Sequence, residues 1–224
     1  MPSGSVPHLI GTGPYGRSGG PYTARALRLI SEGTPLCVID TETTGRIMAG
    51  LPLPLIWQLA ALKIVGGRPV SRLERYIKLG VPLPAEIARL CGVSPLITEQ
   101  RGIPAAAALS DLSRFGAGAL WVGHNIDRFD GPVLREAYRA AGLTLPAALV
   151  HGAERKIDTY RLAREFFPVP SAGDHYLTLE ALADTFGLPH DKSRLHGAAA
   201  DAELCAALLA ALLKLARNAR SAAD

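Results

Sequence analysis

Apolar and polar residues alternate along the chain in patterns that change character after about residue 80. Residues 36–39 are a short apolar run of the kind that forms a buried strand. Residues 56–65 and 70–79 predict two further strands joined by Gly66-Gly67, because both glycines tolerate the positive φ angles of a tight hairpin turn. The first third of the domain is therefore predicted to be a three-stranded meander.

Beyond that point, apolar residues mostly recur with the three-to-four-residue spacing of helices. Predicted helices cover residues 84–90, 105–115, 131–141, 159–167, 178–186 and about 197–218. A short apolar strand over residues 120–122 separates the second of these helices from the third. A meander followed by strands alternating with helices predicts an α/β domain with a mixed sheet.

The N-terminal part differs in composition from the rest. Residues 1–21 are rich in Gly, Pro and Ser and predict a flexible extension. Residues 22–35 predict a short helix, with Thr23 as its cap, and a linker. The domain proper is expected to span residues 36–218, and residues 219–224 to form a C-terminal tail.

Length, charge and cysteine content narrow the class of protein. The 224 residues suffice for one sizeable core and are few for two ordinary domains. A net charge of +4 fits a solvated surface as well as a polyanionic partner. Three dispersed cysteines without CxxC spacing argue against a disulfide framework and a zinc site, and favour a reducing cytosol. With no signal-peptide pattern and no apolar run near 20 residues, we expect a cytoplasmic protein without a membrane span.

Two carboxylates, Asp40 and Glu42, directly follow the first apolar run. Side chains two apart on a strand share a face, so these charges repel each other unless a cation lies between them. Taken alone, the pair is explained more simply as solvated residues at a strand end. Acids near the ends of other core elements change that balance. Asp130 follows the short strand at 120–122, although Asp127 or Asp130 could equally cap the next helix.

His196 and Asp201 lie at the start of the last predicted helix. On one helix they would be about 140° apart, at about 100° per residue. They converge if His196 precedes the helix and Asp201 lies one turn into it. Asp201 stands among small and apolar residues, where a carboxylate needs a partner such as a bound cation.

Four acids without cysteine or clustered histidine form a set of hard oxygen ligands. Such a set suits Mg²⁺ or Mn²⁺ better than zinc. Two cations about 4 Å apart can stabilise the attacking and leaving oxygens of a phosphoryl displacement. A nearby histidine is suited to take a proton from the attacking water.

In this order, the motifs at residues 40–45, 124–130 and 196–201 resemble those of the DEDDh 3′-to-5′ exonuclease family. That family includes the polymerase III epsilon subunit, ribonuclease T, oligoribonuclease and the three-prime repair exonucleases. The resemblance covers about residues 36–215. It implies a ribonuclease-H-like fold, in which helices flank a mixed five-stranded sheet.

The resemblance also implies roles for individual residues. Asp40, Glu42 and Asp201 would hold two Mg²⁺ or Mn²⁺ ions, with Asp40 bridging them. Asp130 would contribute directly or through water, and His196 would be the general base. The 3′-terminal nucleotide would be positioned by Thr41, Thr43, Asn125, Phe129 and His196.

Three features depart from the family pattern. Three residues separate Asn125 from Phe129, where epsilon-type members have two, and this spacing is more similar to that of the three-prime repair enzymes. Arg46 stands where many members carry Leu, and Gln58 where many carry Glu. The proposed metal and base positions are unaffected, so we expect activity to be intact.

The implied activity is removal of nucleoside monophosphates from single-stranded or frayed 3′ ends, with DNA preferred and RNA as the rival substrate. The alternatives are a proofreading subunit and a non-catalytic nucleic-acid-binding module that retains the fold. The chain could associate with a polymerase or a repair protein, or with a second copy of itself as a homodimer. Away from the motifs, His151, His175 and His190 are expected to be exposed, and His124 either touches substrate or makes a structural hydrogen bond.

Overall fold

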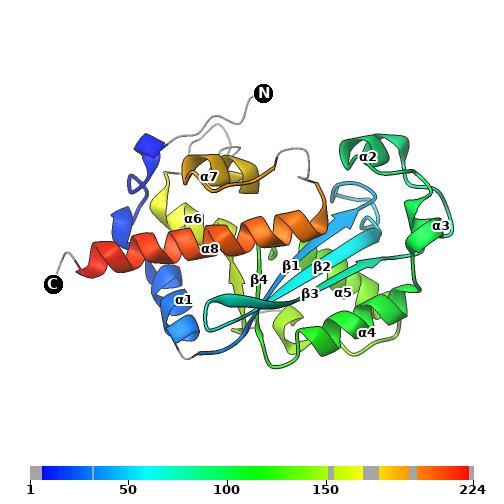
Figure 1. The fold of residues 1–224 in the computed structure, drawn as a ribbon, viewed down its shortest axis with the longest axis horizontal. Coiled ribbons are helices and arrows are strands. Elements are labelled where there is room, and N and C mark those ends of the chain that lie inside the picture. The colour runs from blue at the N-terminus through cyan, green and yellow to red at the C-terminus, as the bar shows by residue number, and fades with distance from the viewer. Residues whose placement is uncertain (1–6, 32, 151–153, 169–176, 192–195, 222–224) are drawn as a thin grey trace.

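The computed structural model describes residues 7–31, 33–150, 154–168, 177–191 and 196–221. It contains a five-stranded mixed sheet with strand order β3-β2-β1-β4-β5 (Figure 1). The strands are β1 (Leu36–Thr43), β2 (Ile56–Val65), β3 (Arg68–Tyr76), β4 (Leu120–Gly123) and β5 (Lys156–Asp158). Strand β2 is antiparallel to both of its neighbours, β1 and β3, whereas β1, β4 and β5 run parallel. The predicted meander and mixed sheet are therefore confirmed.

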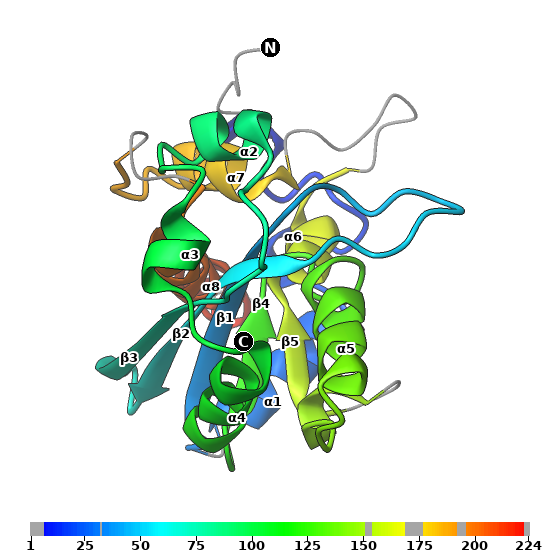
Figure 2. The ribbon, with the colours of Figure 1, turned by 90° about the vertical axis from the view of Figure 1, so that its right-hand side faces the viewer.

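Helices cover both faces of the sheet. One face is covered by α1 (Pro21–Ser31), α6 (Thr159–Phe166), α7 (Leu179–Thr185) and α8 (Ala198–Ser221), and the other by α4 (Ala105–Phe115) and α5 (Asp130–Ala140). Figures 1 and 2 show α8 and the pair α4 and α5 on opposite sides of the strands. Alternate residues of β1 enter the two cores: Val38 faces α8, and Ile39 faces α4 and α5.

A third, small core lies at the end of the sheet where β1 finishes. It forms around the buried side chains of Trp57, Leu83 and Ala88. Two short helices, α2 (Ala85–Leu90) and α3 (Ile97–Arg101), belong to this connection between β3 and α4. The sequence pattern predicted α2 but not α3, whose five residues are too few to display a helical period.

The hairpin between β2 and β3 has the predicted two-residue turn. Gly66 and Gly67 have φ angles of 56° and 76°, and Val65 pairs with Arg68. Strand β3 ends at Tyr76 rather than at residue 79, because the chain turns from the ladder to form an isolated bridge between Ile77 and Ile103.

The N-terminal segment packs against the domain instead of extending from it. The N–H groups of Gly11 and Gly13 donate to the carbonyl of Phe166 at 2.9 and 3.0 Å. A Cβ at Gly13 would lie 2.5 Å from the backbone of α6, so this approach requires glycine. Residues 7–21 are therefore not the flexible extension that was predicted over residues 1–21. Residues 1–6, and residues 222–224 of the predicted tail, lie outside the described residues.

The cap of α1 comes from another part of the chain. The helix begins at Pro21, so Thr23 lies inside its first turn and is not the predicted cap. The buried carboxylate of Glu165, on α6, accepts hydrogen bonds from the backbone N–H groups of Gly20, Tyr22 and Thr23 at 2.9, 3.0 and 2.8 Å. It also accepts the Thr23 hydroxyl at 2.6 Å. These contacts join α1 to α6 and to the core.

None of the helices in the described parts of the chain is long and apolar enough to cross a membrane.

The substitution Glu165→Gln is expected to lower the free energy of unfolding by about 2 kcal/mol, because the helix end loses a charged acceptor. Urea unfolding followed by circular dichroism measures this change. Glu136→Gln, at an exposed position on α5, should leave the midpoint nearly unchanged. Equal midpoints for Glu165→Gln and wild type would contradict the capping role.

Candidate active site

Three carboxylates converge where β1 ends. Asp40 and Glu42 lie two residues apart on β1, and Asp201 is the fourth residue of α8. One carboxylate oxygen from each lies within 4.8 Å of the others. The β1–β2 ladder fixes the first two, since Asp40 pairs with Ala60 and Glu42 with Gln58, and the register shifts directly after Glu42.

Asp130 approaches the same cluster from the other side of the sheet. It is the first residue of α5, is 3% exposed, and accepts the Thr41 hydroxyl at 2.7 Å. Thr41 therefore connects the end of β1 to the beginning of α5. Neither Asp130 nor Asp127 caps α5 with its side chain. Asp127 instead forms ion pairs with Lys156 at 2.6 Å and Arg161 at 3.1 Å.

Burial raises the pKa values of all four acids, and repulsion within the cluster adds to this effect for Asp40 and Glu42. Burial raises the pKa of Asp40 well above its usual range, and the charges of Asp130, Asp201 and Glu42 add to this effect. Burial and the charges of Asp201 and Asp130 raise the pKa of Glu42 to about 8, although the Cys91 thiol opposes the shift by donating to Glu42 at 3.9 Å. The pKa values of Asp130 and Asp201 rise to about 6, in both cases chiefly through burial. A divalent cation would relieve this accumulation of negative charge.

His196 stands immediately before α8, and Asp201 lies one turn into the helix. The Asp201 N–H donates to the carbonyl of Gly197 at 3.1 Å, which closes that first turn. His196 has a left-handed φ of 64° and an exposed side chain, and its charge lowers the pKa of Asp201. The placement that would let the two side chains converge is therefore present.

The amide of Gln58 connects the sheet to the beginning of α8. This buried side chain accepts the Ala198 N–H through Oε1 at 3.3 Å. Its Nε2 donates to Glu74 at 2.7 Å. The hydrogen bond fixes the first turn of the helix that carries Asp201, so Gln58 has a specific structural partner at this position.

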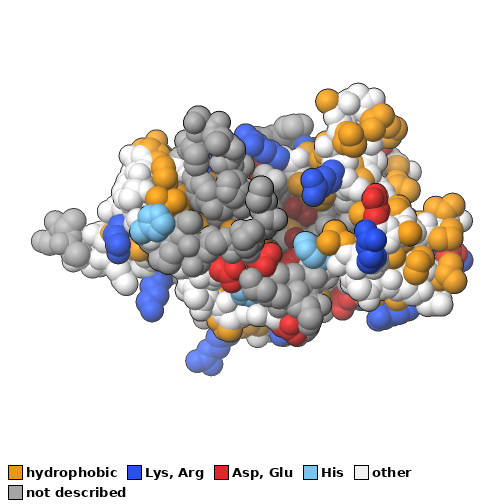
Figure 3. Space-filling model, turned by 90° about the horizontal axis from the view of Figure 1, so that it is seen from above, with side chains coloured by type: hydrophobic (Ala, Val, Ile, Leu, Met, Phe, Trp, Pro, Cys, Tyr) orange, Lys and Arg blue, Asp and Glu red, His pale blue; other side chains and the backbone are white. Residues whose placement is uncertain are grey.

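A cleft of about 360 Å³ opens beside the carboxylates. Figure 3 shows acidic side chains recessed in the hollow near the middle of the face seen from above. The cleft is lined by Asp40, Thr41, Glu42, His124, Asn125, Phe129, Asp130, Tyr160, Leu177, Thr178, Leu179 and Asp201. Thr43, which is predicted to contact substrate, is not among the residues that line this cleft, and its hydroxyl donates to the carbonyl of Gly45 at 2.6 Å.

Asp158 organises one wall of the cleft, a role that the sequence reading missed. It caps α6 by accepting the Tyr160 N–H, and it also accepts the N–H groups of Asn125 and Asp127 at 2.9 and 3.1 Å. These bonds hold Asn125 at a φ of 60°. The Asn125 Oδ1 is buried and has no hydrogen-bond partner among the described residues, and Asn125 lines the cleft. The one sequence feature that could have indicated this role is the position of Asp158 directly after the apolar Ile157, at the end of β5.

Two histidines have structural partners. His124 contacts the Thr159 hydroxyl at 3.0 Å and the Leu177 carbonyl at 2.9 Å, and burial lowers its pKa to about 4. It is therefore a neutral, hydrogen-bonded wall residue. His190 was predicted to be exposed, and this is wrong: its side chain is 9% exposed, because it packs against Asp184. His151 and His175 lie outside the described residues.

Comparison with known proteins places this fold and motif order in a family. A family model described as an exonuclease matches residues 37–209. The 3′-5′ exonuclease DinG of Bacillus subtilis is 32% identical over 181 residues, which cover 81% of this chain and 18% of DinG. A PolC-type DNA polymerase III of Mycoplasma pneumoniae is 30% identical over 74% of this chain and 10% of that protein. The chain thus spans less than a fifth of these relatives.

Solved structures confirm the fold. Exonuclease I of E. coli, in complex with a dT13 oligonucleotide, superposes with a TM-score of 0.65 at 21% identity. The match covers 81% of this chain and 41% of that one. The mixed sheet flanked by helices is therefore the ribonuclease-H-like architecture that the motifs implied. The chain belongs to the DEDDh-type family of 3′-to-5′ exonucleases.

Proposed function

We propose that this chain is a metal-dependent 3′-to-5′ exonuclease that releases nucleoside 5′-monophosphates from single-stranded or frayed DNA ends. The observation that carries the proposal is the carboxylate cluster of Asp40, Glu42 and Asp201 at the side of an open cleft. Membership of the exonuclease family supports the reaction class.

The donor set fits hard divalent cations. Asp40, Glu42 and Asp201 offer carboxylate oxygens, which suit Mg²⁺ or Mn²⁺, and their raised pKa values reflect negative charge that the protein itself leaves poorly compensated. These three residues would hold two cations, with Asp40 between them and Asp130 contributing directly or through water. When bound, the cations stabilise the attacking and leaving oxygens of the phosphodiester.

The remaining residues would position substrate and move a proton. His196 is exposed and stands one turn before Asp201, where it can accept a proton from the attacking water. Phe129 offers an aromatic ring on which the terminal base can stack. Asn125 offers a buried acceptor to the terminal sugar or base.

DNA is the preferred substrate in this proposal. The relatives include proteins named as DNA polymerases, and the similar exonuclease I structure holds a thymidine oligonucleotide. RNA is the rival substrate. Contacts to the 2′-hydroxyl, which only RNA carries, would distinguish the two polymers. The PolC-type relatives also make a polymerase a reasonable partner.

Asp201→Asn is expected to lower kcat by about 10²- to 10³-fold, because it removes one charged ligand from the cluster. The assay follows 5′-labelled DNA and RNA oligonucleotides with Mg²⁺ or Mn²⁺, beside a chelator control. Glu203→Gln on the same helix is the matched control and should retain activity, because Glu203 pairs with Arg72 away from the cluster. Hydrolysis that persists in Asp201→Asn or in the presence of chelator would contradict the metal-dependent mechanism. If the wild-type protein hydrolysed neither DNA nor RNA, the result would favour a non-catalytic nucleic-acid-binding module.

Without a divalent cation, the protein should lose stability as the pH rises. The folded pKa of Glu42 is about 8 and those of Asp130 and Asp201 are about 6, all above the values of unfolded acids. Between about pH 4 and pH 8 the folded state therefore binds more protons, so the free energy of unfolding falls with rising pH. Thermal unfolding in chelator should give a lower Tm at about pH 8 than at about pH 5.

Added Mg²⁺ should reverse this loss, and its stabilising effect should be larger at the higher pH. Glu42→Gln provides the comparison, because this variant lacks one of the titrating acids and should show a weaker pH dependence. A Tm in chelator that rises over the same pH range would contradict the electrostatic description of the site.

A further inference from the structure

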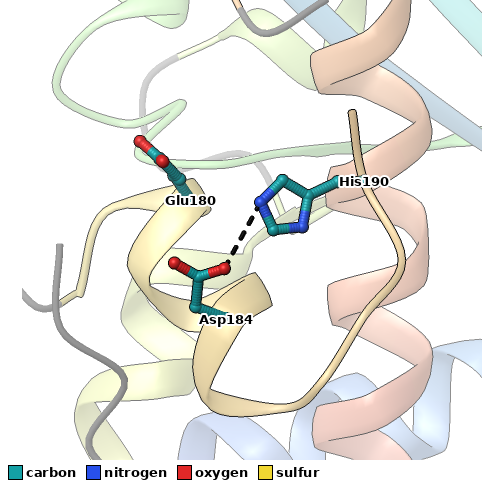
Figure 4. A group of neighbouring side chains, drawn as sticks. All are labelled: Glu180, Asp184 and His190. Carbon is teal, nitrogen blue, oxygen red and sulfur yellow. Dashed lines mark ion pairs between the residues drawn. The ribbon is translucent and has the colours of Figure 1, made fainter. Parts of the chain in front are cut away.

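We propose a second divalent-cation site, outside the cleft, formed by Glu180, Asp184 and His190, and we assign it to Zn²⁺. Each residue offers one ligand atom, and these atoms lie within 4.8 Å of one another. Figure 4 shows the imidazole ring beside the Asp184 carboxylate, with Glu180 on the same helix. This group shares no residue with the carboxylate cluster of the proposed active site.

The local fold explains why the three side chains meet. Glu180 and Asp184 are four residues apart on α7, so they lie on one face of the helix. The chain turns back after α7 through Gly187, whose φ of 62° favours glycine. The turn brings His190 against the helix, with Nε2 at 3.5 Å from the Asp184 carboxylate.

The state of the His190 ring is an independent indication of a ligand. Its Nδ1 lies 2.9 Å from the Leu188 carbonyl, which can only accept a hydrogen bond, so Nδ1 carries a proton. In the neutral ring Nε2 then holds a lone pair. That nitrogen is buried, within a side chain that is 9% exposed, and has no hydrogen-bond partner among the described residues. A ring oriented by a backbone carbonyl, with its other nitrogen directed at carboxylates, is the arrangement of metal-binding histidines.

The donor types select the cation. Imidazole nitrogen and carboxylate oxygen are both ligand types that bind Zn²⁺, and a set of three such ligands leaves a fourth tetrahedral position for water. The imidazole makes Mg²⁺ a poor competitor here, whereas the carboxylates of the cleft favour Mg²⁺. The three dispersed cysteines argued against a zinc site, but the group proposed here contains no cysteine.

The location gives such an ion a structural effect. The site joins α7 to the segment that leads toward α8, and these two helices pack against each other. An ion bound to both would restrain the turn at 187–190. We therefore expect Zn²⁺ to stabilise the fold around α7 rather than to take part in phosphodiester hydrolysis.

Equilibrium dialysis of the metal-stripped full chain against Zn²⁺, in excess Mg²⁺ to occupy the cleft, tests the proposal. We expect about one Zn²⁺ per chain, bound at least about tenfold more weakly by Glu180→Gln and lost in His190→Ala. His8→Ala, at an exposed histidine, is the matched control and should bind as wild type does. Because binding is measured without nucleic acid, an inactive enzyme would not affect the result.

A second measurement keeps the proposal falsifiable if His190→Ala fails to fold. Nitrogen-15 NMR of the wild-type imidazoles should show the His190 Nε2 resonance shifting on addition of Zn²⁺, with Nδ1 still protonated. Zn²⁺ binding equal in wild type and Glu180→Gln, or unchanged His190 resonances, would show that the group is an ion pair only and would overturn the assignment.

Discussion

The structure depends on holding four carboxyl groups together at one edge of a sheet. Asp40 and Glu42 end β1, while Asp130 and Asp201 arrive from helices on opposite faces. Their repulsion would separate these elements if the elements were not fixed independently. Strand β1 is central in the sheet and is buried on both faces, so apolar packing holds the acids in place despite their charge. The raised pKa values record the energetic cost of that arrangement.

Hydrogen bonds that involve no cationic side chain complete the restraint of the site. The Thr41 hydroxyl fixes Asp130, and the Gln58 amide fixes the first turn of α8. Asp158 holds the turn that carries Asn125 through backbone N–H groups. These contacts orient functional groups without adding positive charge that would compete with a cation. An arrangement in which the protein supplies geometry and leaves charge compensation to the ligand suits phosphodiester chemistry.

Features with a local physical cause were predictable from sequence. The turn at Gly66-Gly67 and the apolar run before Asp40 required no distant partner. The spacing of His196 and Asp201 determined where a helix had to begin. The assignment of roles to the acids came from the family resemblance, because a carboxylate at a strand end is by itself equally a solvated residue.

Features that depend on tertiary partners were not predictable. Thr23 has the chemistry of a helix cap, but Glu165 performs that role from 142 residues away. The position of Asp158 before α6 indicates only a local cap, whereas its other donors, the N–H groups of Asn125 and Asp127, lie on a turn that is distant in sequence. His190 looked exposed, since nothing in a polar loop sequence indicates that the chain folds back on α7. In each case the contact that determines the role of the residue is made by a partner distant in sequence, or depends on the geometry of a turn.

The central claim is that the carboxylates of Asp40, Glu42 and Asp201 share divalent cations. The most direct test is anomalous X-ray diffraction at the manganese edge from crystals grown with Mn²⁺ and a short DNA strand. We expect anomalous density among these carboxylate oxygens, adjacent to the terminal phosphate. Crystals with bound DNA and no manganese at the three carboxylates would contradict it.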